Sequence, residues 1–171
     1  ACASTSTTTT PTTTTVPAGP PSPEPRVGLK AGMFDAGQAL WNMRLLSTTP
    51  SPAPFNQNTN SDLAFIGKYA IQGNYSGYQM WDISNPAQPV MTKGFVCPAS
   101  QSDVSVYRNL LILSGEDLRA RIDCGTQGVT DSVSRDRLRG VRIFDISDIN
   151  NPKNVANVQT CRGSHTHSLY V

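Results

Sequence analysis

The stretch Gly77-Tyr-Gln-Met-Trp-Asp-Ile-Ser84 returns 63 positions later as Gly140-Val-Arg-Ile-Phe-Asp-Ile-Ser147. Each copy alternates apolar and polar residues, ends in Asp-Ile-Ser and is soon followed by Asn-Pro, which is typical of a β-strand that runs into a turn. One such unit cannot bury its own apolar face, so the repeat predicts units that pack against one another. The repeat therefore decides the fold class.

The two copies also agree outside this stretch. Ser61-Asp62 precedes the first copy and Ser102-Asp103 precedes the second, and each pair is followed by two further runs of strand type. A fourth run follows each copy. Each unit therefore contains four short strands, and a unit of about 40 residues with four strands has the size of a β-propeller blade. We predict an all-β chain built from β-propeller-type blades of four antiparallel strands.

The repeat also sets the predicted boundaries. Blade 1 is expected over 61–101 and blade 2 over 102–163. Asp62 and Asp82 of blade 1 are 20 positions apart, whereas the matching Asp103 and Asp145 of blade 2 are 42 apart. The difference indicates a 22-residue insertion near 116–139. In a propeller, such an insertion maps to a loop on one face. Because the insertion is rich in arginine, it is either a solvated surface loop or a lip for an anionic ligand.

A third unit begins near the end of the sequence. The stretch from Cys161 to His167 matches the stretch from Cys97 to Asp103, and residues 164–171 are predicted to start a third blade. About two blades and the start of a third do not close a ring, and closure is what removes the exposed edges of a propeller. We therefore expect the sequence to belong to a longer protein, or else to form an open sheet that other copies complete.

The strand ends Met80-Trp-Asp-Ile-Ser-Asn-Pro86 and Ile143-Phe-Asp-Ile-Ser-Asp148 resemble those of the LVIVD-repeat family of bacterial surface and secreted proteins. The resemblance covers about residues 60–171. It implies a β-propeller and an extracytoplasmic location, which means the bacterial cell surface, the periplasm or the medium. It implies no reaction, because the family has no single established activity and a fold alone does not supply one.

Residues 1–25 have a different composition. They are rich in threonine and proline and have no apolar period, which predicts a disordered stalk. The stalk is either a flexible linker or a glycosylated tether. The candidate glycosylation sites are Thr7, Thr8, Thr9, Thr10, Thr12, Thr13, Thr14 and Thr15. Residues 26–60 are predicted to form a bridging segment that packs on the first blade.

Cys2 lies directly before this polar stretch and looks like the acylated cysteine of a bacterial lipoprotein. Ala1 argues against acylation, because the cleavage that precedes it removes every earlier residue. A lipid on Cys2 would anchor the protein to a membrane, and no apolar run approaches the ~20 residues that a spanning helix needs. Contact with a membrane is therefore expected only through this possible anchor.

Three further cysteines are present, and outside the cytoplasm they are expected to oxidise. Cys97 and Cys161 occupy equivalent places in successive units, and Cys124 lies in the insertion. The insertion is therefore closed by Cys97–Cys124 or by Cys124–Cys161. We prefer the first pairing, which leaves Cys161 for a partner beyond residue 171. The spacing of the cysteines is not that of a zinc site.

Both histidines of the chain lie in Ser164-His165-Thr166-His167. Alternate residues on a strand face the same way, so His165 and His167 are predicted ligands for a transition metal. Asp62, Asp103 and His167 fall at equivalent positions, which predicts a ligand site at the mouth of the central channel. The alternative is structural, because polar residues before an inner strand also fix blade-linking turns by hydrogen bonds.

Other signals are few. Asn74-Tyr75-Ser76 is a formal N-glycosylation sequon, and a turn between strands explains it equally well. The net charge of +2 is too mild to indicate nucleic-acid binding. No phosphate-binding loop or nucleophile elbow occurs, and no cofactor is firmly indicated.

The sequence thus predicts an exported, surface-tethered binding or assembly module with no evident catalytic activity. Its expected partners are a protein or glycan ligand, or other copies of itself. One alternative is a metal-dependent propeller enzyme that uses His165 and His167, so the question of enzymatic activity stays open. A second alternative is a structural subunit of an extracellular filament.

Overall fold

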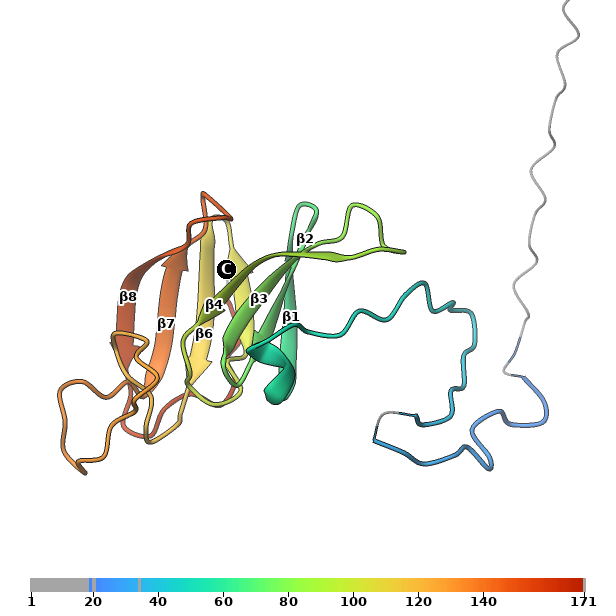
Figure 1. The fold of residues 1–171 in the computed structure, drawn as a ribbon, viewed down its shortest axis with the longest axis horizontal. Coiled ribbons are helices and arrows are strands. Elements are labelled where there is room, and N and C mark those ends of the chain that lie inside the picture. The colour runs from blue at the N-terminus through green and yellow to red at the C-terminus, as the bar shows by residue number, and fades with distance from the viewer. Residues whose placement is uncertain (1–18, 20, 34, 171) are drawn as a thin grey trace, which may run out of the picture. The chain divides into compact units, whose positions relative to one another are not determined.

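The computed structural model describes residues 19, 21–33 and 35–170 (Figure 1). Cys2 and the eight threonines named as glycosylation candidates lie outside the described residues. The chain divides into two compact units, Ala1–Leu45 and Leu46–Val171, and all the strands belong to the second. The two units are described separately below.

The second unit contains two four-stranded antiparallel sheets with strand orders β1-β2-β3-β4 and β5-β6-β7-β8. The strands of the first sheet are β1 (Asn60–Ile66), β2 (Tyr69–Asn74), β3 (Gly77–Asp82) and β4 (Val90–Val96). Those of the second are β5 (Val104–Tyr107), β6 (Leu110–Gly115), β7 (Gly140–Asp145) and β8 (Lys153–Gln159). The predicted all-β class is therefore confirmed, and both sheets are open within the described residues.

The two sheets repeat in register as well as in sequence. Phe65, Ala70 and Trp81 lie side by side across the first sheet, at the positions that Val106, Leu111 and Phe144 hold in the second. A register shift follows Met80 in β3 and Ile143 in β7, again at matching places. The third strand of each sheet therefore has the same local geometry, including its irregularity.

A glycine opens the third strand of each sheet for a steric reason. Gly77 and Gly140 have φ angles of +143° and +151°, which L side chains rarely adopt. A Cβ atom at Gly77 would overlap the carbonyl oxygen of Phe95, and one at Gly140 would overlap that of Val158. The glycine at the start of each repeated phrase lets the fourth strand approach the third.

The core lies between the two sheets. Ala64, Ile71 and Met80 form one apolar row on the first sheet, and this row faces Leu111 and Phe144 of the second. Four of these five side chains are completely buried, and burying a side chain of this size contributes roughly 1.5–3 kcal/mol. Strand alternation thus decides which face of each sheet enters the core.

Aromatic rings strengthen the same interface. Tyr78 stacks on Phe95 with ring centroids 5.3 Å apart, and Phe144 meets the Phe95 ring edge-on at 5.2 Å. These are favourable arrangements for aromatic pairs. The buried hydroxyl of Tyr78 has no hydrogen-bond partner in the part of the chain that the structure describes, and burial raises the pKa of this group far above its usual range. The neutral phenol therefore behaves as part of the apolar core.

The repeated Asp-Ile-Ser phrases form the turns that the sequence predicts. Asp82 accepts a hydrogen bond from the Ser84 backbone at 2.8 Å, and Asp145 accepts one from the Ser147 backbone at 2.8 Å. Lys68 and Ser84 together lower the pKa of Asp82 to about 2. Both carboxylates are therefore ionised acceptors that fix the end of the third strand.

The side chain of Asn74, the asparagine of the sequon, makes structural hydrogen bonds. The Asn74 side chain is completely buried and donates to the carbonyl oxygen of Phe55 at 3.1 Å and to the side chain of Asn60 at 2.8 Å. Its own oxygen accepts a bond from the Ser76 backbone at 2.8 Å. Asn74 thus closes the β2–β3 hairpin, and its amide nitrogen faces the interior.

Residues 46–58 belong to the same compact unit as the sheets. Within this segment, the short 3-10 helix η1 (Phe55–Gln57) buries Phe55 against β4, where a side chain at Gly94 would overlap the Phe55 ring. Ser47 also donates a hydrogen bond to the Pro86 carbonyl oxygen at 2.8 Å. This part of the predicted bridging segment therefore packs on the first sheet.

We expect Phe144→Ala to lower the free energy of unfolding by about 3–5 kcal/mol, because it removes a fully buried aromatic ring from the interface between the sheets. Urea denaturation followed by tryptophan fluorescence measures the change. Val133→Ala is the control, because Val133 is 91% exposed, and its effect should stay within about 0.5 kcal/mol. Similar effects of the two substitutions would contradict the described core.

Candidate functional site

Asp62, Asp103 and His167 are the three residues predicted at equivalent positions. Burial lowers the pKa of His167, and the charges of Asp103 and then Asp62 partly oppose this shift. Asp62 lies inside β1, whereas Asp103 directly precedes β5. We call these three electrostatically coupled residues the Asp62–Asp103–His167 cluster.

Close packing of the backbone creates this cluster. β1 lies beside β5, and the chain at Ser102 passes so near β2 that a side chain at Gly73 would overlap the Ser102 carbonyl oxygen. The Ser61 hydroxyl donates a hydrogen bond to the Gln101 carbonyl oxygen at 2.5 Å. Ser61, which lies inside β1, thus ties the first sheet to the segment that leads into β5.

His167 is held by a chain of hydroxyl groups. Its Nδ1 lies 2.9 Å from the Ser114 Oγ, which in turn lies 2.9 Å from the Ser164 Oγ. The Ser164 backbone N–H donates to the Gly115 carbonyl oxygen at 3.0 Å, so this segment is fixed to the end of β6. The buried Nε2 of His167 has no hydrogen-bond partner among the described residues, and burial lowers the pKa of the ring below its usual value.

His165 has different partners from His167. Its Nδ1 lies 2.5 Å from the Glu116 carboxylate, and the Gln101 amide lies 2.8 Å from its Nε2. This pair of His165 and Glu116 is half-exposed at the surface. The two imidazoles are therefore anchored separately, one to the start of the insertion and the other to β6.

The expected strand at the start of a third blade is absent from the described residues, because residues 164–170 contain no strand. A strand needs a neighbour for its backbone groups, and this segment instead uses its polar side chains to bind β6 and the insertion. The argument that alternation aims both imidazoles at one ion is therefore wrong. Among the described residues, no group of three or more His, Cys, Asp or Glu side chains is placed to hold a metal. A metal site at His165 and His167 stays a prediction.

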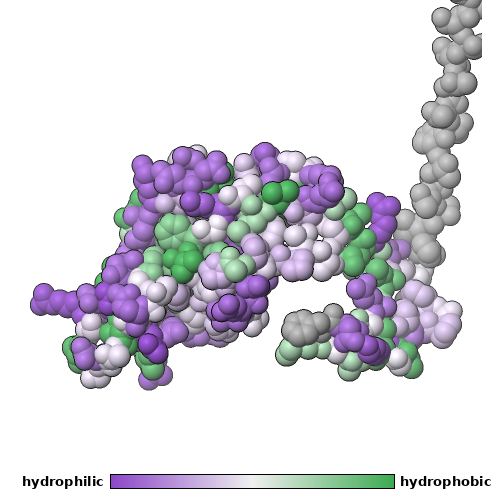
Figure 2. Space-filling model, viewed as in Figure 1, coloured by the Kyte–Doolittle hydropathy of each residue, from purple (hydrophilic) through white to green (hydrophobic). Residues whose placement is uncertain are grey.

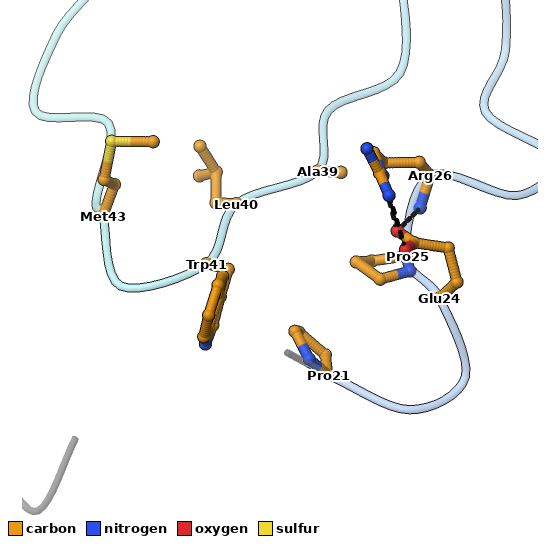
Figure 3. Close-up of a pocket in the computed structure, with 8 residues that line it drawn as sticks. All are labelled: Pro21, Glu24, Pro25, Arg26, Ala39, Leu40, Trp41 and Met43. Carbon is orange, nitrogen blue, oxygen red and sulfur yellow. Dashed lines mark hydrogen bonds and ion pairs between the residues drawn. The ribbon is translucent and has the colours of Figure 1, made fainter. Parts of the chain in front are cut away.

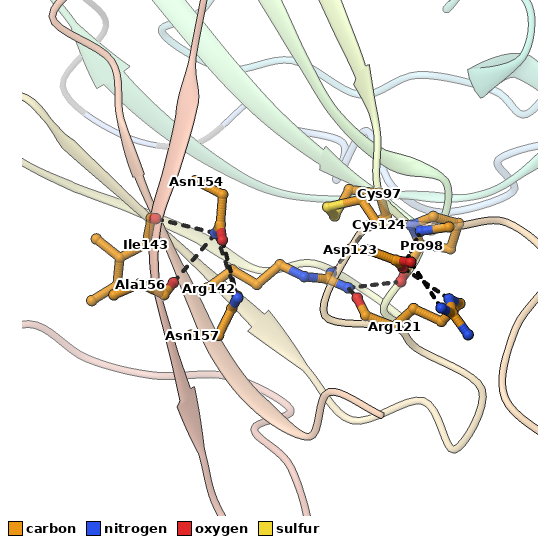
Figure 4. Close-up of a disulfide and its surroundings, with 11 residues drawn as sticks. Cys97, Pro98, Arg121, Asp123, Cys124, Arg142, Ile143, Asn154, Ala156 and Asn157 are labelled. Carbon is orange, nitrogen blue, oxygen red and sulfur yellow. Dashed lines mark hydrogen bonds and ion pairs between the residues drawn. A yellow bond between two sulfur atoms is a disulfide. The ribbon is translucent and has the colours of Figure 1, made fainter. Parts of the chain in front are cut away.

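The insertion is closed by a disulfide between Cys97 and Cys124, the preferred pairing (Figure 4). Cys161 is exposed and carries a free thiol within the described part of the chain. The insertion connects β6 to β7, whose end residues Gly115 and Gly140 pair directly. In the first sheet, the corresponding connection between β2 and β3 is a turn of only two residues. The length of the insertion therefore leaves the register of the second sheet unchanged.

Arg142 is the residue that sequence reasoning missed. Its side chain is completely buried and extends from β7 to the disulfide, where the guanidinium donates to the carbonyl oxygens of Cys97 at 3.2 Å and Arg121 at 2.5 Å (Figure 4). Burial lowers its pKa to about 10, while the charge of Asp123 raises it. The group stays protonated at neutral pH and joins the insertion to the sheet.

The sequence does contain a signal for this residue. Gln79 occupies the matching position in the first sheet, and it is also completely buried, with its amide donating to Asn60 at 3.0 Å. A polar residue at the same strand position in both copies indicates a buried hydrogen-bonding role. Arg142 differs from Gln79 in its length, which allows it to reach the insertion.

The first unit contains a small hollow of about 330 Å³ between the turn at Pro21–Arg26 and the segment Ala39–Met43 (Figure 3). Its lining is mostly apolar and includes Trp41. Among the described residues, the charged groups that line it are Glu24 and Arg26, which bond to each other at 2.8 Å. Its two charged groups therefore neutralise one another.

Comparison with known proteins gives no match to a family model, to a curated protein or to a solved structure. The LVIVD-repeat resemblance therefore stays a prediction from the sequence. No helix in the described residues is long and apolar enough to cross a bilayer. The candidate sites are accordingly judged on their geometry alone.

We expect NMR titration to give His167 a pKa below 6.5, because burial disfavours the imidazolium ion. Asp103→Asn should lower this pKa further by removing a nearby negative charge, whereas Asp117→Asn, in the exposed insertion, should not. Because the pKa of His167 is lower in the folded protein than in the unfolded chain, the unfolded chain binds the proton more readily. The free energy of unfolding should therefore fall as the pH drops through the His167 pKa. A His167 pKa that is insensitive to Asp103 would contradict the described cluster.

We expect Cys124→Ala to lower the free energy of unfolding by about 2–4 kcal/mol, because the disulfide closes a 27-residue span. Chemical denaturation of the oxidised protein measures this loss. Cys161→Ala serves as the matched control, since the free thiol of Cys161 constrains nothing. Equal stabilities of the two variants would show that the disulfide does not support the fold.

Proposed function

We propose that this chain is a β-propeller-type assembly module whose two sheets act as successive blades. On this proposal the outer faces of the two sheets bind further four-stranded sheets of the same kind. The observation that carries the proposal is the correspondence between the buried and the outer faces. The LVIVD-repeat resemblance agrees with it.

The buried interface joins two different faces. The first sheet contributes the row Ala64, Ile71 and Met80, and the second sheet contributes Leu111 and Phe144 from its opposite face. An interface between unlike faces can be repeated indefinitely, because every added sheet offers the same face that was just covered.

Each outer face matches one side of the buried interface. On the first sheet, the outer row is Phe65, Ala70 and Trp81, which corresponds to Val106, Leu111 and Phe144. On the second sheet, the outer residues Ile112 and Ile143 correspond to Ile71 and Met80, and Val141 and Val158 correspond to Tyr78 and Phe95. The two outer rows therefore correspond to the two sides of the buried interface, and Phe65 is the open member of the first row, since Ala70 and Trp81 are each only 7% exposed.

The exposed side chains on these faces also favour docking. Phe65 is 61% exposed and Val158 is 47% exposed. The residues in the corresponding rows of the buried interface are, by contrast, largely buried. On the side shown in Figure 2, hydrophilic residues dominate the sheets and hydrophobic residues form small separate patches. Large exposed apolar side chains at repeat positions indicate a surface that another sheet covers.

The disulfide and the threonine-rich stalk support an extracytoplasmic site of action. A disulfide that closes a structural loop persists in oxidising compartments. The stalk would hold the blades away from a surface, and the insertion would present its side chains to ligands. On this proposal the module binds and assembles, with a protein, a glycan or further copies as its partners.

We expect the purified chain to associate reversibly as its concentration rises, as measured by light scattering coupled to size-exclusion chromatography. Phe65→Asp should block the outer face of the first sheet, and Val158→Asp should block that of the second. Each variant alone should be monomeric, because head-to-tail growth needs both faces. A mixture of the two variants should form dimers, since each retains the face that the other lacks.

Val133→Asp is the matched control, because it adds the same charge to an exposed position in the insertion. It should leave the association unchanged. A wild-type chain that stays monomeric at every concentration, or association that survives both face substitutions, would overturn the proposal. Failure of the mixed variants to dimerise would show that the interface joins like faces instead.

A further inference from the structure

A second surface, separate from the sheet faces, lies on the insertion at 116–139, whose loops appear in orange in Figure 1. It contains an open hollow of about 650 Å³, within the range of small-molecule sites at roughly 300–1,000 Å³. Three arginines line this hollow, together with two apolar residues and two residues with hydroxyl groups. They are Arg119, Arg137, Arg139, Leu118, Val129, Thr130 and Ser132.

Local backbone structure gathers the three arginines. Residues 120–122 and 136–138 form a short antiparallel ladder, with Arg121 opposite Arg137 and hydrogen bonds on either side. Arg137 and Arg139 alternate along the chain, so both face the same side. Arg119 packs over Gly128, where any side chain would overlap its guanidinium. The sequence thus concentrates three positive charges at one place.

These three guanidinium groups have no carboxylate partner within the described residues. They donate only to backbone carbonyl oxygens: Arg137 to Asp131 and Ser132, Arg139 to Arg162, and Arg119 to Gln127 at 3.4 Å. Arg121, in the same insertion, is instead neutralised by Asp123 at 2.8 Å and by Asp136. The hollow therefore holds a concentrated positive charge that the protein leaves uncompensated.

The guanidinium group itself favours an anion, because it stays protonated and carries several N–H donors. Arginine also matches oxyanions in geometry, because its planar group offers paired N–H donors.

We infer that this hollow binds an acidic saccharide through its sulfate or carboxylate groups. The three arginines would bind the anionic groups, while Thr130 and Ser132 offer hydroxyl partners for sugar hydroxyls. No aromatic residue lines the hollow, so it lacks the stacking platform that single-stranded nucleic acids use. This inference is independent of blade stacking, because none of the seven lining residues lies on an outer sheet face.

Isothermal titration with three tetrasaccharides of matched size tests the inference. A heparin-derived probe supplies sulfate groups, an oligogalacturonate supplies carboxylates, and a maltotetraose is neutral. At least one acidic probe should bind, the neutral probe should not, and binding should weaken as sodium chloride is raised. Inorganic sulfate should compete only weakly, because it engages one anion position instead of several.

Arg119→Gln is the main test variant, because within the described residues the Arg119 side chain makes only one long hydrogen bond, and its loss should leave the fold intact. It should weaken binding about tenfold, as expected for one charge-assisted contact. Arg135→Gln removes the same charge from an exposed position of the same insertion that does not line the hollow, and should change affinity less than about twofold. Intact disulfide and unchanged circular dichroism verify folding of both variants.

Three outcomes would overturn the inference. The first is absence of binding to either acidic probe by the folded protein, and the second is equal weakening by the Arg119 and Arg135 substitutions. The third is tighter binding of an oligothymidylate of equal charge, which would assign the hollow to nucleic acid. Because Arg119→Gln leaves both sheet faces intact, it should not alter self-association, so the two proposals fail independently.

Discussion

The apolar contact between the two sheets is the constraint on which the rest of the structure depends. Phe144 and Leu111 pack against Ile71 and Met80, and strand alternation then assigns every other side chain to a face. A slip of one residue in any strand would move its apolar side chains out of the core. The matching register shifts in β3 and β7 keep this assignment the same in both sheets.

The two candidate surfaces arise from different parts of this arrangement. The cluster of Asp62, Asp103 and His167 exists because the inner strands are adjacent and the chain crosses closely over Gly73. Its hydrogen bonds are chiefly structural, since the serine chain to His167 fixes a connecting segment. The arginine hollow, by contrast, lies on the side of the insertion lined by Arg119, Arg137 and Arg139, whereas Cys124 and the Arg121 backbone of the same insertion are bonded to Cys97 and Arg142. Within the insertion, the contacts that hold the fold and those offered to ligands thus involve different residues.

The strands, the Asp-Ile-Ser turns and the disulfide could be predicted, because each follows from local alternation, side-chain capping or the limited choice of cysteine partners. The burial of Arg142 and the packing of Phe55 on Gly94 could not, since both depend on which distant segments meet. Residues 164–170 were expected to form a strand on the strength of the repeat, but hydrogen bonds from Ser164, His165 and His167 fix them otherwise. Closure of the sheets into a ring could not be predicted either, because the alternation of apolar and polar residues does not specify the angle between sheets.

The pairing of Gly115 with Gly140 has a consequence for engineering. The β6–β7 connection leaves and re-enters the sheet at neighbouring positions, and the corresponding connection in the first sheet needs only Tyr75 and Ser76. Loop-closure entropy rises slowly with length, so this hairpin end tolerates very different numbers of residues. Peptides of foreign origin could be grafted into the exposed part of this connection, provided that Cys124 and the backbone contact to the buried Arg142 are kept.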